Sequence, residues 1–287
     1  MARMTTLQDK ARLFRSLHRP GRPLALANAW DVPSARLVEA AGAPAVATTS
    51  AGVAWSVGVA DGDHIGRDAA LAAAERIAAA VDVPVTADIE SGFGATPDDV
   101  ARTVRDVVAA GAVGVNIEDV HPADPSAQRP AEQQAERISA ARRAADDAGG
   151  ALYVNARADA FLRSVGEPGD RLPDTLERAA AYIAAGADGV FVPGVTDPDT
   201  VGALVRSIDA PLNILAGPGA PDVATLAALG VARVSLGSAV TGAAYAVVRR
   251  SARELFDTGT YTSIDDHLSY GELNALMLER PATPPNA

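Results

Sequence analysis

Apolar and polar positions follow one another in a pattern that recurs along most of the chain. Each copy is an amphipathic or Ala-rich stretch, then a glycine, then a short apolar run that ends in polar residues, as in 107–119. A helix that stops at a left-handed glycine and leads into a strand has this pattern. The pattern predicts helices over 5–17, 32–41, 68–80, 132–148 and 197–208. It predicts strands over 24–28, 45–50, 84–90, 114–119, 153–159, 189–194, 211–217 and 233–238.

Units of this kind favour a closed α/β fold, the (β/α)8 TIM barrel, because right-handed crossovers place consecutive strands side by side until the last closes on the first. An open, doubly wound sheet is the alternative. Two further helical stretches, 239–258 and 265–278, exceed what a barrel needs, and their apolar residues require a partner surface such as a neighbouring subunit. We therefore expect an N-terminal helix in 1–20, the barrel in 21–258, and a C-terminal helix with a disordered, Pro-rich tail in 259–287.

Composition narrows the class of protein. Apolar residues make up 48% of the 287 residues and aromatics only 4%, so the core should be mainly Ala, Val, Leu and Ile. The absence of cysteine excludes disulfides, a thiolate nucleophile and thiolate-ligated metals. A net charge of −11 argues against nucleic acid or an anionic membrane surface as a partner. No apolar run approaches a membrane span, and 1–20 lacks the apolar core of a signal peptide, so we expect a cytoplasmic protein.

The chemistry of the chain is concentrated in 84–94. Apolar residues there alternate with Thr86, Asp88 and Glu90, which is the pattern of a strand with two carboxylates on one face. Two neighbouring acids usually require a cation or a shared proton. The alternative is an exposed strand end whose acids touch nothing.

Other predicted strands also end in polar residues, and in a barrel the carboxyl ends of all strands meet at one mouth. Carboxylate oxygens without Cys or His partners suit Mg²⁺ or Mn²⁺, and an arginine opposite the metal could bind a carboxylate of the substrate. Glu118 could instead pair with Arg157 for structure alone, and Asp119 faces away by strand parity, as a structural ion pair or helix cap would. His64 and His121 follow barrel strands and are weak candidates, whereas His18 and His267 are predicted to be surface or packing residues. The polar strand ends are 48–52, Asp88, Glu90, Asn116, Glu118, Asp119, Asn155, Arg157 and Asp159.

Taken together, six segments resemble the isocitrate lyase / phosphoenolpyruvate mutase superfamily, with a correspondence that runs from about Asn28 to Tyr261. The resemblance implies an enzyme that forms or breaks C–C or C–P bonds next to a 2-oxo or 2-hydroxy carboxylate, through an enolate held on Mg²⁺. It also implies a homo-oligomer, a tetramer or a dimer, in which a C-terminal helix is swapped between subunits. The segments are NAWD at 28–31, TSAGVA at 49–54, GVADG at 58–62, DIESGFG at 88–94, VNIED at 115–119 and NARAD at 155–159.

The resemblance also implies roles for single residues. Asp88 is similar to the direct metal ligand, and Asp61, Glu90 and Glu118 are similar to the acids that hold the waters of the metal. Arg157 matches the cation on the substrate's oxygen and carboxylate. The residues expected to bind the substrate are Trp30, the backbone amides of Ser50, Ala51 and Gly52, Asn116, Asn155 and Arg157.

Two departures from the superfamily affect the expected reaction. The usual Asp-x-Asp is Asp88-Ile89-Glu90 here, so the second acid has a longer side chain. The loop at 120–130 lacks both the Lys-Lys/Arg-Cys-Gly-His motif of the lyases and the Lys and Asn of the mutases. The hypothesis is that His121, Asp124 or Ser126, which lie in this loop, supply protons. We expect a Mg²⁺-dependent lyase or decarboxylase for a small oxo or hydroxy acid. The alternatives are a C–P enzyme, such as a phosphonopyruvate hydrolase or phosphoenolpyruvate mutase, and a non-catalytic carboxylate-binding barrel.

Overall fold

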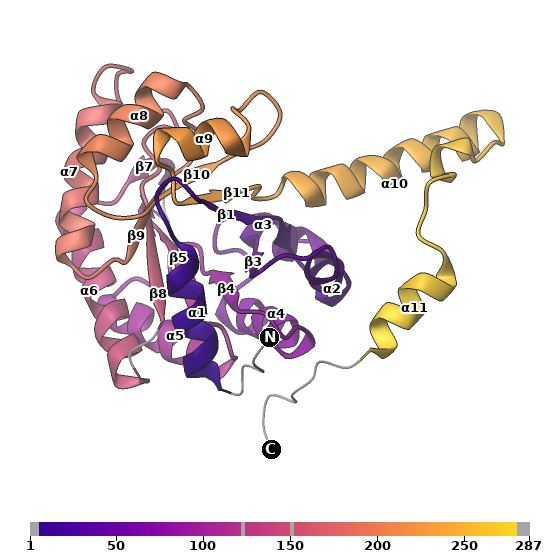
Figure 1. The fold of residues 1–287 in the computed structure, drawn as a ribbon, viewed down its shortest axis with the longest axis horizontal. Helices are drawn as coiled ribbons and strands as arrows, with labels where there is room; N and C mark the ends of the chain where they lie inside the picture. The colour runs from indigo at the N-terminus through magenta and orange to yellow at the C-terminus, as the bar shows by residue number, and fades with distance from the viewer. Residues whose placement is uncertain (1–5, 122–123, 150–151, 280–287) are drawn as a thin grey trace.

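The structure, a computed structural model, describes residues 6–121, 124–149 and 152–279. Its main sheet is parallel, with the order β1-β11-β10-β9-β8-β5-β4-β3-β2. The short strands β1 (Leu24–Leu26) and β2 (Asn28–Ala29) are consecutive pieces of one stave, and they pair with β11 and β3 respectively, so the sheet closes. The predicted barrel is confirmed and the open sheet is wrong (Figure 1). The other staves are β3 (Val46–Thr48), β4 (Val85–Asp88), β5 (Gly114–Glu118), β8 (Tyr153–Arg157), β9 (Gly189–Val192), β10 (Leu212–Leu215) and β11 (Arg233–Ser235).

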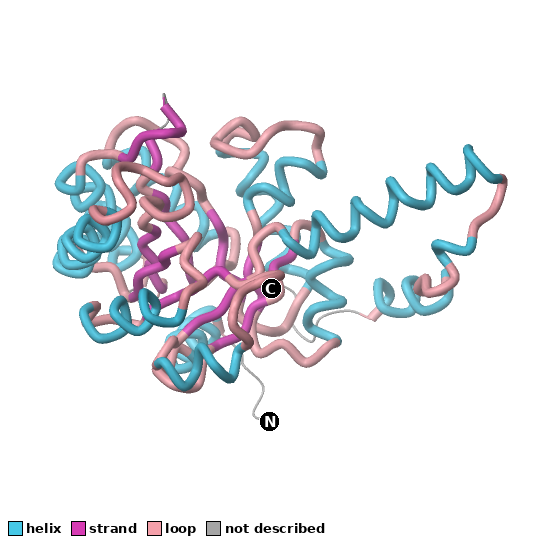
Figure 2. The backbone as a smooth tube through the Cα atoms, turned by 90° about the horizontal axis from the view of Figure 1, so that it is seen from above, coloured by secondary structure: helices cyan, strands magenta, loops and turns pink. Residues whose placement is uncertain are grey.

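Helices surround the strands, as the view from above shows (Figure 2). Their ends follow local chemistry: α5 begins with a capping box between Thr96 and Asp99, and α9 ends at Gly230, whose φ of 98° is left-handed. The first helix seals the start of the barrel, because Phe14 packs with Leu24, Leu26 and Tyr153. These helices are α1 (Leu7–Leu17), α2 (Val32–Ala40), α4 (Arg67–Ala80), α5 (Pro97–Ala109), α6 (Ala131–Asp147), α7 (Arg171–Ala184), α8 (Pro198–Ser207) and α9 (Val223–Leu229).

Two elements at the mouth of the barrel were not predicted. The second strand ends at Thr48 rather than at 50, and a short helix, α3 (Ser50–Ser56), follows it. The segment after Glu118 contains an antiparallel hairpin of β6 (Val120–His121) and β7 (Asp124–Gln128), where an irregular loop was expected. Both elements are too short for their periodicity to stand out in the sequence.

The last helices form an arm that projects from the barrel (Figures 1 and 2). The helix α10 (Ala239–Thr258) has the predicted bounds, and Thr241 is its one buried residue. The predicted helix 265–278 is wrong at its start: a 3-10 turn, η1 (Thr262–Ile264), precedes α11 (Tyr270–Leu278), which begins at a capping box on Ser269. Helix swapping between subunits stays a prediction, and the Pro-rich tail lies outside the described residues.

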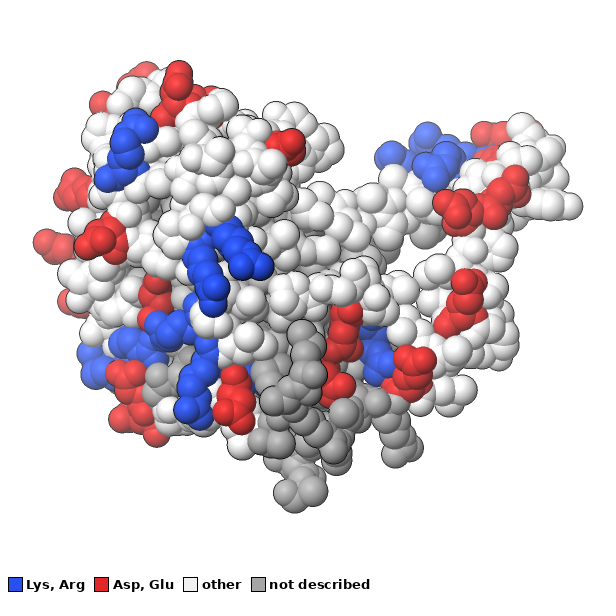
Figure 3. Space-filling model, in the orientation of Figure 1, with Lys and Arg blue, Asp and Glu red and all other residues white. Residues whose placement is uncertain are grey.

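Acidic and basic side chains are interspersed over the barrel face shown in Figure 3. Among the described residues, no helix is both long enough and apolar enough to cross a membrane. His18 is a packing residue, which is one of the two roles predicted for it. Its ring stacks on that of Tyr153, with 4.0 Å between the ring centroids, and its Nδ1 donates to the Phe14 carbonyl. Burial, with help from Arg233, lowers the pKa of His18 to about 3, so the ring is neutral.

Candidate active site

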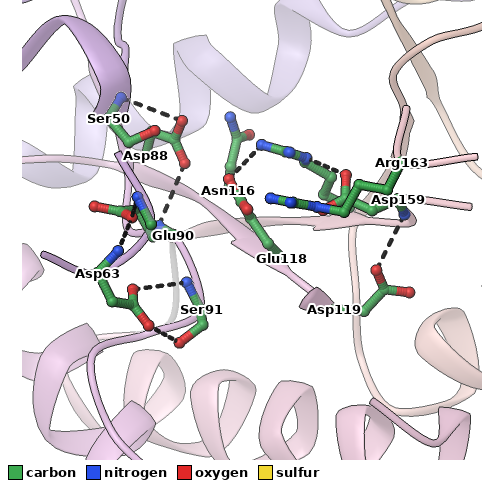
Figure 4. Close-up of polar contacts among 12 residues, drawn as sticks. Ser50, Asp63, Asp88, Glu90, Ser91, Asn116, Glu118, Asp119, Asp159 and Arg163 are labelled. Atoms are coloured by element: carbon green, nitrogen blue, oxygen red, sulfur yellow. Dashed lines mark hydrogen bonds and ion pairs between the residues drawn. The ribbon is translucent and has the colours of Figure 1, made fainter. Parts of the chain in front are cut away.

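Asp88 lies at the end of β4 and connects two turns at the mouth of the barrel (Figure 4). Its Oδ2 accepts the backbone N–H of Ser50, and its Oδ1 accepts that of Glu90, both at 3.4 Å. Its own N–H donates to Thr48 Oγ1 at 2.8 Å. The carboxylate is therefore held between the first turn of α3 and the turn that follows β4.

Glu90 lies beyond the strand, in a turn. The predicted strand 84–90 is too long, and Glu90 has a φ of 50°, so strand parity does not place it beside Asp88. Its Oε2 accepts the backbone N–H groups of Gly62, at 2.8 Å, and of Asp63. Its Oε1 is buried and has no hydrogen-bond partner in the part of the chain that the structure describes. One oxygen of this buried carboxyl is thus left for a ligand.

Asp63 contributes to the site, whereas Asp61 is the acid predicted from the same loop. Asp63 has a φ of 63°, and its carboxylate accepts the N–H of Ser91, at 3.2 Å, and the Ser91 hydroxyl. Asp61 is exposed, but its charge still raises the pKa of Asp88 and of Glu90. The two acids are separated by one glycine, and only the fold shows which of them is fixed.

Glu118 and Arg157 face each other on adjacent strands, in register. Arg157 Nη1 donates to Glu118 Oε1, and Arg157 Nε donates to Asp159 Oδ1 at 2.6 Å. Burial acts to lower the pKa of Arg157, but Asp159, Glu118 and Asp88 together raise it above its ordinary value. A permanent guanidinium charge therefore stands opposite the acids of the mouth.

The carboxyls of this site resist ionisation. Burial is the largest influence on Asp88, Glu90 and Glu118, and it raises the pKa of each, to about 8 for Glu90. Arg157 acts in the opposite direction on Asp88 and Glu118, and the hydrogen bond from Asp63 does so on Glu90, without cancelling the effect of burial. A cation that arrives among these groups would favour their ionised forms.

The donor set fits a hard divalent cation such as Mg²⁺ or Mn²⁺ better than zinc, because it consists of carboxylate oxygens. Within the described residues, no group of three or more His, Asp or Glu side chains is arranged to hold a metal by itself. Mg²⁺ often keeps several waters and takes only one or two carboxylates. The partnerless Oε1 of Glu90 fits this outer, water-mediated kind of contact.

Neighbouring side chains pack closely against the first turn of α3 because Gly52 has no side chain. A Cβ there would lie 2.6 Å from Thr241 Oγ1, 2.7 Å from Thr49 Cγ2 and 2.9 Å from Trp30 Cβ. Ser50 and Ala51 precede it and are buried, and Trp30 is half-buried against it. The structure thus brings these four predicted substrate-binding residues together.

Asn116 and Asn155 lie deeper, inside the barrel. Asn155 Nδ2 donates to Asn116 Oδ1 at 2.9 Å and to Asn213 Oδ1 at 3.2 Å, and Arg233 Nη2 donates to Asn116 at 3.3 Å. Burial lowers the pKa of Arg233 to about 10. Neither Asn213 nor Arg233 was predicted: Asn213 is a polar residue inside an otherwise apolar strand, and Arg233 is the first residue of the short strand β11.

The remaining candidates are Asp119, which is buried, and three histidines, which are partly or fully exposed. Asp119 is a structural ion-pair residue, which confirms one of its predicted roles: its Oδ2 lies 3.3 Å from Arg178 Nη1. Burial raises the pKa of Asp119 to about 6. His121 is half-buried in β6, while His64 and His267 are exposed.

Comparison with known proteins finds similar chains that cover most of this one. The family model described as phosphoenolpyruvate phosphomutase matches residues 14–256. An uncharacterised protein of Mycobacterium tuberculosis (strain ATCC 25618 / H37Rv) is 38% identical over 93% of this chain and 96% of its own length. The 2-methylisocitrate lyase of Escherichia coli (strain K12) is 31% identical over 67% of this chain and 64% of its own.

A solved structure from Burkholderia cenocepacia J2315, that of a candidate lyase or mutase, has a TM-score of 0.89 and 39% identity, over 98% of this chain and all of that one. The family match covers most of the barrel, and relatives this similar extend over nearly the whole chain. The chain therefore belongs to the phosphoenolpyruvate phosphomutase family, within the isocitrate lyase/phosphoenolpyruvate mutase superfamily.

Proposed function

We propose that the chain is a Mg²⁺-dependent lyase or decarboxylase that cleaves a C–C bond of a small 2-oxo or 2-hydroxy carboxylate through an enolate intermediate. The observation that carries the proposal is the meeting of Asp88, Glu90 and Glu118, from separate strands and turns, with the buried cation Arg157. The 2-methylisocitrate lyase of E. coli and an oxaloacetate decarboxylase of Pseudomonas putida (strain W619), 32% identical over 62% of this chain, support the reaction class.

In this proposal each side chain has a defined task. Asp88 would bind the metal directly, and Glu90, Glu118 and Asp61 would orient its waters. The amides of 50–52 hold one carboxylate of the substrate. Cleavage leaves negative charge on the enolate oxygen, and the fixed guanidinium of Arg157 stabilises that charge more in the transition state than in the substrate. Mg²⁺, when bound, would supply further positive charge at the same oxygen.

Proton transfer is assigned to the hairpin that replaces the lyase motif. His121 is the candidate, because it is the titratable imidazole nearest in sequence to Glu118. Replacing it with Ala should lower turnover about 10²-fold if it is the acid or base. Unchanged turnover would remove His121 from the proposal and leave the enolate-stabilising groups untouched.

C–P chemistry is the second candidate. A phosphonopyruvate hydrolase solved with oxalate and Mg²⁺ is 27% identical with a TM-score of 0.81, over 93% of this chain and 94% of that one. A candidate phosphonomutase from B. cenocepacia J2315 is 42% identical with a TM-score of 0.83, over 89% of this chain. The missing Lys and Asn in 120–130 weigh against this reaction here.

Two experiments test the proposal in sequence. Calorimetric titration of oxalate, an enolate mimic, should show binding with Mg²⁺ and none without it, and Asp88→Asn should abolish the metal-dependent part. Incubation with oxaloacetate, 2-methylisocitrate and phosphonopyruvate should then release pyruvate from one of the first two. Phosphate release from phosphonopyruvate would favour the second candidate. Failure of oxalate and Mg²⁺ to bind together would leave only a non-catalytic barrel.

We further propose a cytoplasmic homo-oligomer, a dimer or a tetramer. The support for the assembly is the arm, whose apolar side chains include Phe256 at 81%, Tyr270 at 84% and Leu278 at 80% exposure. Apolar residues exposed to this degree along one projecting element are typical of a surface that another subunit covers. The absence of cysteine fits a reducing compartment.

A further inference from the structure

A buried polar cluster lies directly behind Glu118, and we call its members Asp119, Gln128, Asp159, Arg178 and Tyr182 the Asp119 cluster. Asp119 is fully buried. Its Oδ2 accepts from Tyr182 Oη at 2.8 Å, from Gln128 Nε2 at 2.9 Å and from Arg178 Nη1 at 3.3 Å. Its Oδ1 accepts the backbone N–H of Asp159 at 3.0 Å (Figure 4). One oxygen of the carboxylate thus binds Gln128 of the hairpin and two residues of α7, and the other binds Asp159.

One oxygen fastens the base of the hairpin. Gln128 is the last residue of β7, and its side chain reaches Asp119 Oδ2. The next residue, Arg129, donates its N–H to the Asp119 carbonyl at 2.7 Å, and its own carbonyl accepts from Arg178 Nη1 at 2.8 Å. The hairpin is therefore fixed to Asp119, the residue that follows β5, and to α7 through the same group of contacts.

The other oxygen reaches the substrate-facing cation. Asp159, whose N–H is held by Asp119, is fully buried, and its Oδ1 accepts from Arg157 Nε at 2.6 Å. Arg163 Nε adds a contact of 3.4 Å to Oδ2 of the same residue. A displacement of Asp159 would therefore displace the guanidinium of Arg157.

We propose that Asp119 is a positioning residue that keeps the hairpin β6–β7 in a fixed place relative to Arg157. The inference rests on the proposed function, because the hairpin carries His121 and Arg157 is the proposed substrate cation. Burying a carboxylate is costly unless its hydrogen bonds are made, and here all of the observed bonds go to the hairpin, to α7 and to the residue that holds Arg157. Small misplacements of catalytic groups lower rates steeply, so this link would affect turnover rather than stability alone.

Variants can separate the contacts of Asp119 Oδ2 with the hairpin from the contact of Asp119 Oδ1 with Asp159. Gln128→Leu removes only the donor from the hairpin, since Gln128 Oε1 already lacks a partner among the described residues. Asp119→Asn keeps an oxygen that can accept the N–H of Asp159. In place of Oδ2 it puts an NH₂ group, which cannot accept hydrogen bonds from Gln128, Arg178 and Tyr182. Tyr182→Phe is the matched control, because it removes one bond to the same oxygen and one bond accepted from Arg178 Nη1, and neither of these bonds is made to the hairpin itself.

Hydrogen exchange of the wild-type and variant chains, followed by mass spectrometry on peptides covering 119–129, reports the hairpin directly. We expect faster exchange there in Gln128→Leu and Asp119→Asn but not in Tyr182→Phe. With the substrate found active, turnover should fall about 10-fold or more in the first two, while the affinity for oxalate with Mg²⁺ changes by less than about threefold.

Wild-type exchange rates in Gln128→Leu and Asp119→Asn would overturn the proposal, and so would an equal loss of turnover in Tyr182→Phe. If Asp119→Asn fails to fold, Gln128→Leu decides alone. The exchange measurement needs no substrate. A wild-type chain that turns over nothing would therefore count against the proposed function, while the exchange data would still test the positioning role.

Discussion

At the scale of single residues, the carboxyl of Glu90 should make the protein respond to pH. Burial raises the pKa of Glu90 in the folded chain to about 8, above its ordinary value. The folded state therefore holds the proton more tightly than the unfolded state does. Stability from this group is complete at acidic pH and is lost as the pH rises through the folded pKa. Without metal, the melting temperature should fall between about pH 5 and pH 8, and less so in Glu90→Gln.

Divalent metal should reverse this trend, because a cation favours the ionised carboxyls. The affinity for Mg²⁺ in the presence of oxalate should therefore rise with pH until Glu90 has lost its proton at about 8. The raised pKa values of Asp88 and Glu118 act in the same direction. Titration calorimetry at several pH values measures this dependence, and an affinity that does not change with pH would contradict it.

Asp63 and Asp61 offer a second test at this scale. Asp63 accepts two hydrogen bonds from Ser91 and donates its N–H to Glu90, whereas Asp61 is exposed and its charge raises the pKa of Asp88 and Glu90. Asp63→Asn should therefore lower both stability and metal affinity. Asp61→Asn, the matched control, should weaken Mg²⁺ binding modestly and leave the melting temperature within about a degree. Equal effects of the two changes on stability would show that the contacts of Asp63 are unimportant.

At the scale of elements, the missing side chain of Gly52 lets α3 pack closely on the start of α10. Gly52→Ala would place a methyl group within 3 Å of Thr49, Trp30 and Thr241, and should cost about 1–3 kcal/mol of stability. Gly242→Ala is the matched control: it lies next to Thr241, in a helix, with no atom within 4 Å of the added Cβ. It should stabilise the chain by about 0.5–1 kcal/mol. Urea unfolding of both variants measures the difference.

The same elements show how far the sequence determines the structure. The staves and outer helices could be predicted because each is several residues long and buries an apolar face of regular period. The helix α3 and the hairpin β6–β7 could not, because short segments at the mouth take their shape from contacts with distant residues. Glu90 shows the same limit within the site: its position depends on a left-handed turn after β4 rather than on the parity of a strand. The mouth as the meeting place of Asp88, Glu118 and Arg157 was predictable, since it follows from the barrel itself.

At the scale of the whole molecule, the arm has more apolar surface than the single chain can bury. The single chain offers α11 a contact on α2, where Arg36 Nη2 donates to the Leu276 carbonyl at 2.9 Å, but most large apolar residues of the arm stay exposed. The most exposed of these on α10 is Phe256, at 81%, and Val248 follows at 64%. Hydrophobic surface of this extent is stabilised when a second subunit covers it.

Light scattering coupled to size-exclusion chromatography should therefore give a mass of two or more chains for the wild type. Phe256→Glu should shift the protein toward the monomer, because a buried, unpaired carboxylate opposes association. Val223→Asp is the matched control: Val223 is also exposed, at 44%, but lies at the start of α9, away from the arm. A monomeric wild type, or equal dissociation by both changes, would mean that the arm is not the assembly surface. In that case its apolar residues would have to fold back on the barrel or bind a different protein.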